Sequence, residues 1–127
     1  MDKIKKVLLV DDEESTTEYA LMLMDEYEDE LEIVIAHDGL EGLEKFKEAK
    51  GSDKPFDYVV SDVTMPVMTG IEMVTEIQKI DQDVKVIILT AHSKFDLKYM
   101  QELESLNLMH IFHKPFLITK LFEEILD

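Results

Sequence analysis

KVLLVDD, residues 6–12, is an apolar run that stops at two adjacent aspartates. A short run that is apolar on both faces is typical of a strand buried inside a parallel sheet. Asp11 and Asp12 suit two roles at the end of such a strand. They can form the turn and N-cap that lead into a helix, or they can provide oxygen ligands for a cation. The segment alone leaves both roles open.

Four further apolar runs have the same character and are expected to be strands: Leu31–Ala36, Tyr58–Ser61, Lys85–Leu89 and Met109–His113. An amphipathic stretch follows each of the five runs. Regular alternation of strand and helix predicts an α/β domain whose parallel sheet is covered by helices on both faces. A length of 127 residues, without repeats or linkers, favours one domain spanning residues 1–127.

The helical stretches carry apolar side chains at the spacing of one helix face. The first is expected to open with Ser15 and Glu18, which have capping-box spacing. The side chains expected to face the core are Ala20, Leu23, Met24 and Tyr27, then Leu40, Leu43 and Phe46, then Ile71, Val74 and Ile77, then Leu97, Met100 and Leu103, and last Ile118, Leu121, Phe122 and Ile125.

Composition excludes several classes of function. There is no cysteine for a disulfide or a thiolate metal site, and a net charge of −16 argues against nucleic acid as a direct partner. The apolar runs are too short to span a membrane. Residues 1–6 are charged and lead directly into a strand, which is unlike a signal peptide. We therefore expect a cytoplasmic protein that has no membrane partner.

Polar residues follow the predicted strands where each one ends. Asp11 and Asp12 follow the first strand, Asp62 the third, Thr90 the fourth and Lys114 the fifth. Ligands bind at the carboxyl ends of the strands in an open parallel sheet. We therefore expect these five residues, spread over about a hundred positions, to meet in one pocket.

Three carboxylates in one pocket repel each other. Two unit charges ~4 Å apart cost about 4 kcal/mol at an effective dielectric of 20. Such a cluster must bind protons or a cation, and an all-oxygen cluster suits magnesium. Magnesium beside a lysine is a common arrangement for holding a phosphoryl group. A carboxylate can itself be the nucleophile, which gives an aspartyl phosphate.

The segments Val10-Asp11-Asp12-Glu13, Asp62-Val63-Thr64-Met65-Pro66 and Lys114-Pro115-Phe116 resemble the receiver domains of bacterial two-component response regulators. The ordered set of five positions carries the resemblance, since each motif by itself is common. The resemblance covers almost the whole chain and implies a flavodoxin-like (βα)5 doubly wound fold, with a five-stranded parallel sheet of order 2-1-3-4-5.

The resemblance also implies roles for particular residues. Asp62 would be the phosphoacceptor. Mg²⁺ would be held by Asp12 directly, by Asp11 through water, by Asp62, and by the backbone carbonyl of Thr64.

Two further residues would act on the phosphoryl group. Lys114 would pair with the phosphoryl oxygens, Thr90 would hydrogen-bond one of them, and a cis peptide bond between Lys114 and Pro115 would aim the lysine into the pocket.

The implied activity is a phosphorylation-dependent switch rather than a turnover enzyme. Its phosphoryl donor would be a sensor histidine kinase or a phosphotransfer protein. Its output would pass to another domain or partner, and a homodimer through the face from the fourth to the fifth helix is a further interaction that the resemblance allows. The chain can be a stand-alone protein or one module of a longer regulator.

Several positions depart from the family pattern, and one of them bears on the switch. Receivers commonly carry Tyr or Phe three residues before the lysine, where this chain has Ile111, followed by Phe112. We expect the switch to work through the Thr90 loop without an aromatic residue that swings inward.

Three alternatives remain at this point. An aspartate-nucleophile phosphatase would usually have its nucleophile after the first strand and a second acid two residues later, where Asp62 is followed by Thr64. A flavin carrier of the same fold would need a phosphate loop after the first strand, where this chain has four acidic residues. A receiver that is never phosphorylated would be expected to lack a pocket residue, and all five are present.

Overall fold

The computed structural model describes residues 4–63, 65, 67–90, 97–113 and 118–126, with the side chains of 97–99 left out. The predicted alternation of strand and helix is confirmed. The elements are β1 (Lys5–Val10), α1 (Glu14–Met24), η1 (Asp25–Tyr27), β2 (Leu31–Ala36), α2 (Gly39–Lys50), β3 (Tyr58–Asp62), α3 (Gly70–Ile80), β4 (Lys85–Thr90), α4 (Leu97–Glu104), β5 (His110–His113) and α5 (Ile118–Leu126). The expected strands are correct to within one residue at each end.

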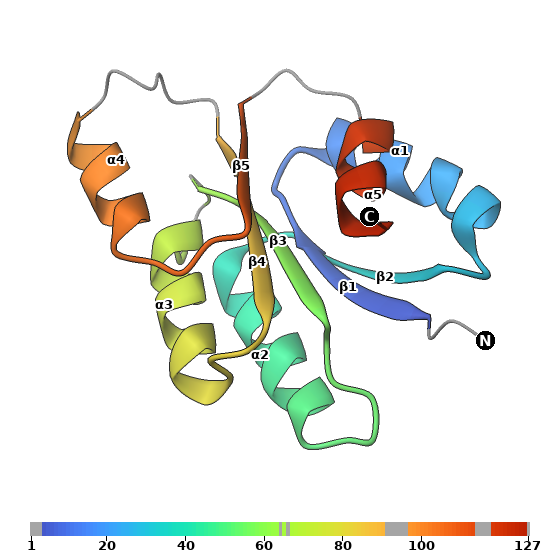
Figure 1. Ribbon diagram of the computed structural model, residues 1–127, viewed down its shortest axis with the longest axis horizontal. Coiled ribbons are helices and arrows are strands. Elements are labelled where there is room, and N and C mark those ends of the chain that lie inside the picture. Colours follow the sequence, from blue (N-terminus) through green and yellow to red (C-terminus); the bar gives the residue numbers. More distant parts are fainter. Residues whose placement is uncertain (1–3, 64, 66, 91–96, 114–117, 127) are drawn as a thin grey trace.

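The five strands form one parallel sheet of order β2-β1-β3-β4-β5 (Figure 1). This is the doubly wound, flavodoxin-like arrangement that the resemblance implies. The register aligns Val10 with Ser61, and Asp62 with Leu89. The last residues of β1, β3 and β4 therefore lie next to one another at one edge of the sheet.

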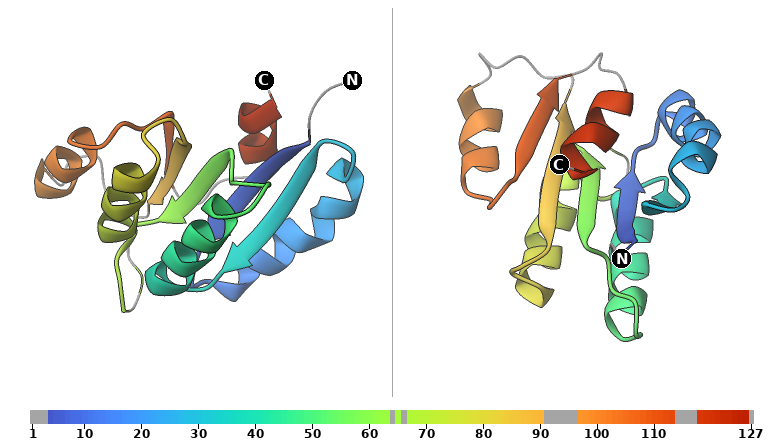
Figure 2. Two further views of the ribbon diagram at one scale, coloured as in Figure 1. Left: turned by 90° about the horizontal axis from the view of Figure 1, so that it is seen from below. Right: turned by 45° about the vertical axis from the view of Figure 1, so that its right-hand side comes forward.

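Helices cover both faces of the sheet, α1 and α5 on one side and α2, α3 and α4 on the other (Figure 1), and Figure 2 shows these two layers in further views. Strand alternation supplies both cores. In β1, Val7 and Leu9 belong to the cluster beneath α1 and α5, whereas Leu8 and Val10 belong to the cluster beneath α2, α3 and α4. A strand with two buried faces must be apolar throughout, which explains the unbroken run in the sequence.

The amphipathic faces of the helices were predicted well, with one exception. All four expected residues of α5 are buried, as are Val74 and Ile77 of α3. Leu40 was expected in the core but is 42% exposed. It lies in the first turn of α2, outside the buried face of the helix, which includes Leu43 and Phe46. The side chain of Leu97 lies outside the described part of the chain.

The capping box expected at Ser15 and Glu18 is wrong. Helix α1 begins at Glu14, and its N-cap residue Glu13 makes no side-chain capping hydrogen bond. A capping box does form at α3, where Thr69 and Glu72 satisfy each other's backbone N–H groups. Capping-box spacing alone does not show whether Ser15–Glu18 or Thr69–Glu72 forms the box. At the first of these, Asp11 holds the turn after β1, and the helix begins one residue before Ser15.

In the described part of the chain, no helix is both long enough and apolar enough to cross a membrane.

Candidate metal and phosphoacceptor site

The site lies at the carboxyl edge of the sheet, where β1 and β3 are neighbours. Asp62 is the last residue of β3, and Asp11 and Asp12 directly follow β1. The pairing of Val10 with Ser61 brings the ends of the two strands together. The convergence expected of these three aspartates is therefore present in the fold.

The three carboxylates approach closely. One oxygen from each of Asp11, Asp12 and Asp62 lies within 4.8 Å of the other two. Asp11 is fully buried, Asp62 is 6% exposed, and Asp12 faces solvent. Two buried carboxyl groups beside an exposed third form an acidic cluster that is in contact with solvent at Asp12.

Asp11 also organises the loop that follows it. Its Oδ1 accepts a hydrogen bond of 2.9 Å from the backbone N–H of Glu13, and its own N–H donates to the carbonyl of Ala36 in β2. The first bond is a local turn of the kind that Asp favours. Asp11 thus has the turn-forming role as well as a place in the acidic cluster, so the two readings of Asp11-Asp12 are compatible.

Thr90 ends β4, one residue beyond the pairing of Asp62 with Leu89, and it is 1% exposed. It therefore lies one strand away from Asp62 on the same edge of the sheet. The other predicted members of the pocket, Thr64, Lys114 and Pro115, lie outside the described residues, as does the expected cis peptide bond. Ile111 and Phe112 lie in β5, and both are half-buried.

Sequence reasoning did not single out Ser61 or Gly70, which contact the main chain of Asp62. The Ser61 hydroxyl donates to the Asp62 carbonyl at 2.7 Å, and the Cα of Gly70 packs against the same carbonyl. The only sequence feature that could have indicated this contact is the glycine at the start of the predicted helix, and a glycine there is equally typical of an ordinary loop.

The donor set fits magnesium. The three described ligands are all carboxylates, and Mg²⁺ prefers oxygen donors at about 2.0–2.1 Å and keeps several of its waters. Oxygen atoms as far apart as 4.8 Å leave room for some of these contacts to pass through water. The geometry therefore accommodates a hydrated Mg²⁺ that has few direct protein ligands.

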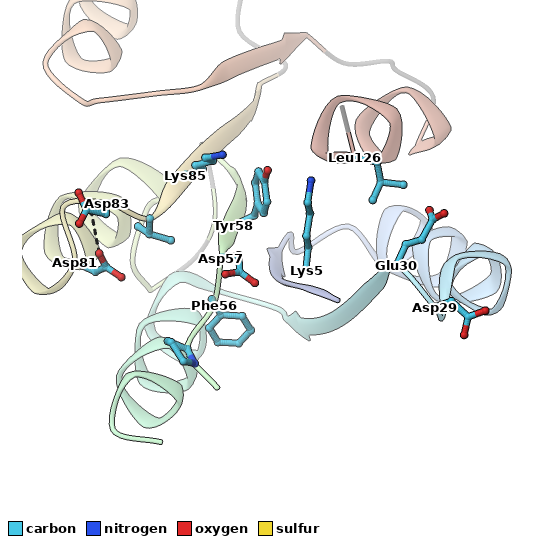
Figure 3. A pocket seen from close by; sticks show the side chains of 12 residues that line it. Lys5, Asp29, Glu30, Phe56, Asp57, Tyr58, Asp81, Asp83, Lys85 and Leu126 are labelled. Carbon is cyan, nitrogen blue, oxygen red and sulfur yellow. Dashed lines mark hydrogen bonds between the residues drawn. The ribbon is translucent and has the colours of Figure 1, made fainter. Parts of the chain in front are cut away.

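A cavity of about 740 Å³ lies elsewhere, at the amino edge of the sheet, and none of its lining residues is a predicted site residue. Lys5 and Lys85 approach the ring of Tyr58 from either side (Figure 3). The Lys5 ammonium and the Tyr58 hydroxyl both donate to the carbonyl of Ile125, at 2.8 Å and 3.2 Å. Such donors satisfy carbonyls in the last turn of a helix, so these side chains hold the end of α5.

Comparison with known proteins agrees with the geometry. The protein-family model described as the response regulator receiver domain matches residues 7–126 of this chain. Sporulation initiation phosphotransferase F of Bacillus subtilis is 34% identical over 89 residues, which are 64% of this chain and 69% of that protein. The chain spans only 13% and 42% of the length of two further curated relatives that it matches.

Solved structures show the same likeness over nearly the whole chain. The chemotaxis protein CheY4 of Vibrio cholerae has a TM-score of 0.78 and 31% identity, and the match covers 97% of both chains. The response regulator TrrA of Thermotoga maritima, solved in complex with Mg²⁺ and BeF, has a TM-score of 0.73 and 34% identity over 96% of both chains.

These matches set aside the phosphatase and the flavin carrier. The fold, the acidic cluster and a family match over almost the full length agree: the chain belongs to the family of response regulator receiver domains, the signalling switches of two-component systems.

Proposed function

We propose that the chain is a receiver that accepts a phosphoryl group on Asp62 and changes its surface in response. One observation carries this proposal. The Asp62 carboxylate ends β3 within 4.8 Å of oxygens from Asp11 and Asp12, and Asp12 is exposed to solvent. The whole of residues 1–127 acts as one such domain, as a cytoplasmic switch rather than a turnover enzyme.

Asp62 acts as the nucleophile. One of its carboxylate oxygens attacks the phosphorus of a phosphohistidine on a sensor kinase or a phosphotransfer protein. A P–O bond forms as the P–N bond breaks, and the imidazole leaves with the electron pair and takes up a proton. Dephosphorylation needs water, which attacks the same phosphorus, restores the carboxylate and releases inorganic phosphate.

The neighbouring residues prepare the pocket for that charge. Asp12 and Asp62 would hold Mg²⁺ directly, Asp11 through water, and Thr64 through its backbone carbonyl. When bound, the metal supplies positive charge that offsets both the carboxylates and the incoming phosphoryl oxygens. Asp11 keeps the β1–α1 turn in place through its bond to the N–H of Glu13, so Asp12 stays at the mouth of the site.

Thr90 and Lys114 respond to the product. The phosphoryl group brings a charge of about −1.5 to −2 into the pocket. The Thr90 hydroxyl donates to one phosphoryl oxygen and the Lys114 ammonium pairs with another. Thr90 ends β4, and Lys114 follows β5 in the sequence. Their response therefore changes the neighbouring α4–β5–α5 face for an output domain, a partner or a second copy of the chain.

The test is phosphorylation by acetyl phosphate with Mg²⁺, followed by intact mass. Wild type should gain one phosphoryl group and Asp62→Asn none. Asp53→Asn, which changes an exposed aspartate in the loop before β3, should gain the group as wild type does. A persistent gain in Asp62→Asn would place the acceptor on another residue, and no gain in wild type under these conditions would remove the proposed function.

A further inference from the structure

Gly70, the first residue of α3, lies against the main chain of Asp62. A Cβ built on Gly70 would lie 1.9 Å from the carbonyl oxygen of Asp62 and 2.9 Å from its carbonyl carbon. Real Cβ atoms essentially never approach another heavy atom of this kind closer than 3.0 Å. The helix can therefore start this close to the end of β3 only because residue 70 has no side chain.

Ser61 holds the same carbonyl by a hydrogen bond. Its hydroxyl is buried and donates to the Asp62 oxygen at 2.7 Å, and it lies 2.8 Å from the place that a Cβ of Gly70 would take. The Asp62 carbonyl oxygen and the Ser61 hydroxyl therefore both lie against the position that a Cβ of Gly70 would take. An alanine at position 70 would disturb both contacts at once.

The next peptide is fixed as well. The N–H of Gly70 donates to the carbonyl of Val63 at 2.8 Å, and the N–H of Val63 donates to the carbonyl of Leu89 in β4 at 3.1 Å. Residues 62 and 63 are therefore held by β4 on one side and by the start of α3 on the other. The backbone of Asp62 has little freedom to adjust its carboxylate.

This restraint matters because the Asp62 carboxylate faces two others. Its oxygen lies within 4.8 Å of oxygens from Asp11 and Asp12, and mutual repulsion pushes it away when no cation is present. A reacting group displaced by about 1 Å can lose about 10²-fold in rate. A Cβ at position 70 would have to move about 1 Å away from the Asp62 carbonyl, because its distance of 1.9 Å is about 1 Å below the 3.0 Å limit. A Gly70→Ala substitution would therefore shift the main chain of Asp62 by about the distance that affects the rate.

We propose that Gly70 and Ser61 are positioning residues for phosphoryl transfer: they fix the main chain of Asp62 and so hold its carboxylate in the acidic cluster. This inference rests on the proposed function for its kinetic consequence. Its effect on metal binding does not depend on phosphoryl transfer.

The experiment compares Gly70→Ala and Ser61→Ala with Gly42→Ala in the whole chain. Gly42 is a matched control, because its Cβ would meet the Sδ of Met73 at 2.7 Å and a methyl of Val10 at 2.9 Å rather than any part of Asp62. Three quantities are measured for each variant: the urea midpoint, the Mg²⁺ dissociation constant from calorimetric titration, and the phosphorylation rate at saturating Mg²⁺ and acetyl phosphate.

Gly70→Ala should weaken Mg²⁺ binding about 10-fold and lower the saturating rate by about 10- to 100-fold. Ser61→Ala should lower the rate several-fold. Gly42→Ala should lose stability yet keep both the Mg²⁺ affinity and the saturating rate within about 2-fold, because its clash is with the side chains of Met73 and Val10 and not with the main chain of Asp62. A purely structural role for Gly70 predicts that the two glycine variants differ only in their urea midpoints.

The inference is overturned if Gly70→Ala and Ser61→Ala both keep the Mg²⁺ affinity and the saturating rate of wild type. If circular dichroism shows that Gly70→Ala does not fold, Ser61→Ala decides the matter. If wild type takes up no phosphoryl group, the proposed function fails. The Mg²⁺ titration still tests the inference in that case, because it reports whether the Asp62 carboxylate has left the cluster.

Discussion

The side chains of Ile111 and Phe112 lie on opposite faces of β5. Ile111 packs against the core beneath α2, α3 and α4, whereas Phe112 packs against the core beneath α1 and α5. The ring of Phe112 lies 4.4 Å from that of His110, and the Nδ1 of His110 lies 3.7 Å from Glu124 of α5. Of Ile111 and Phe112, the aromatic residue therefore lies on the α5 side of the sheet, and the aliphatic residue lies on the α4 side.

We predict a switch that does not use a swinging ring. Structures with and without a beryllofluoride mimic should show a shift of the loop from Thr90 to Ser93 and no change in the face that Phe112 occupies. Phe112→Leu should lower the free energy of unfolding by about 1 kcal/mol and leave the shift of the Thr90 loop intact. Relocation of the Phe112 ring to the Ile111 side, with a static Thr90 loop, would contradict this mechanism.

Magnesium should stabilise the wild-type fold, and it should reverse the order in which wild type and Asp12→Ala melt. Without the metal, removing one of three clustered carboxylates relieves repulsion, so the variant should melt at a higher temperature than wild type. With Mg²⁺ at about 100 times its dissociation constant, wild type gains about 2.7 kcal/mol and should melt at the higher temperature. Thermal melts of both proteins with EDTA and with Mg²⁺ test this crossover. Equal Mg²⁺ affinity in wild type and Asp12→Ala would show that the assigned ligands are wrong.

Val67 carries backbone strain that substitution should relieve. It has a φ of 71° and is 78% exposed, and a β-branched residue is rarely found in that region. Val67→Asn should raise the free energy of unfolding by about 0.5–1 kcal/mol, because Asn tolerates the left-handed conformation and little packing is lost. Val67→Ala, which keeps the Cβ, should gain less. Urea unfolding measures the difference, and a less stable Val67→Asn would indicate that the Val67 side chain makes a contact of its own.

The ion pair between Lys50 of α2 and Asp81 at the end of α3 should make stability depend on pH. Burial acts to raise the pKa of Asp81, but the backbone N–H of Asp83 and the Lys50 ammonium 3.2 Å away outweigh it, so the pKa lies below its ordinary value. A carboxyl group with a depressed pKa stabilises the fold above its unfolded pKa, and this contribution is lost as the pH falls through the folded value.

Lys50→Met should therefore be less stable than wild type by about 0.5–1 kcal/mol near neutral pH, and the difference should close as the pH falls from about 4 towards 2. Urea midpoints across that range provide the measurement. Lys79→Met, which breaks an exposed pair with Glu76 inside one helix, should cost less at neutral pH. A Lys50→Met difference that stays constant down to pH 2 would mean that the Asp81 pKa is not involved.

Local patterns in the sequence were sufficient for the architecture and for the acidic cluster. Runs such as Lys6–Val10 are apolar on both faces because they are covered on both sides, and this property is visible without coordinates. The aspartates that end β1 and β3 could be brought together by one rule about parallel sheets. The family followed from the order of those residues.

Contacts between segments far apart in the chain could be decided only by the tertiary structure. Ser15 and Glu18 have the spacing of a capping box, yet α1 starts at Glu14, because the chain leaves β1 through a turn held by Asp11. Leu40 has the right period for a core residue but lies on the open side of α2. The contact of Gly70 with Asp62 likewise has no periodic signal, because it depends on how closely the start of a helix packs against the end of a neighbouring strand. Hydrophobic periodicity records which side of an element is buried, whereas the distance between two backbones is set by the packing of the whole molecule.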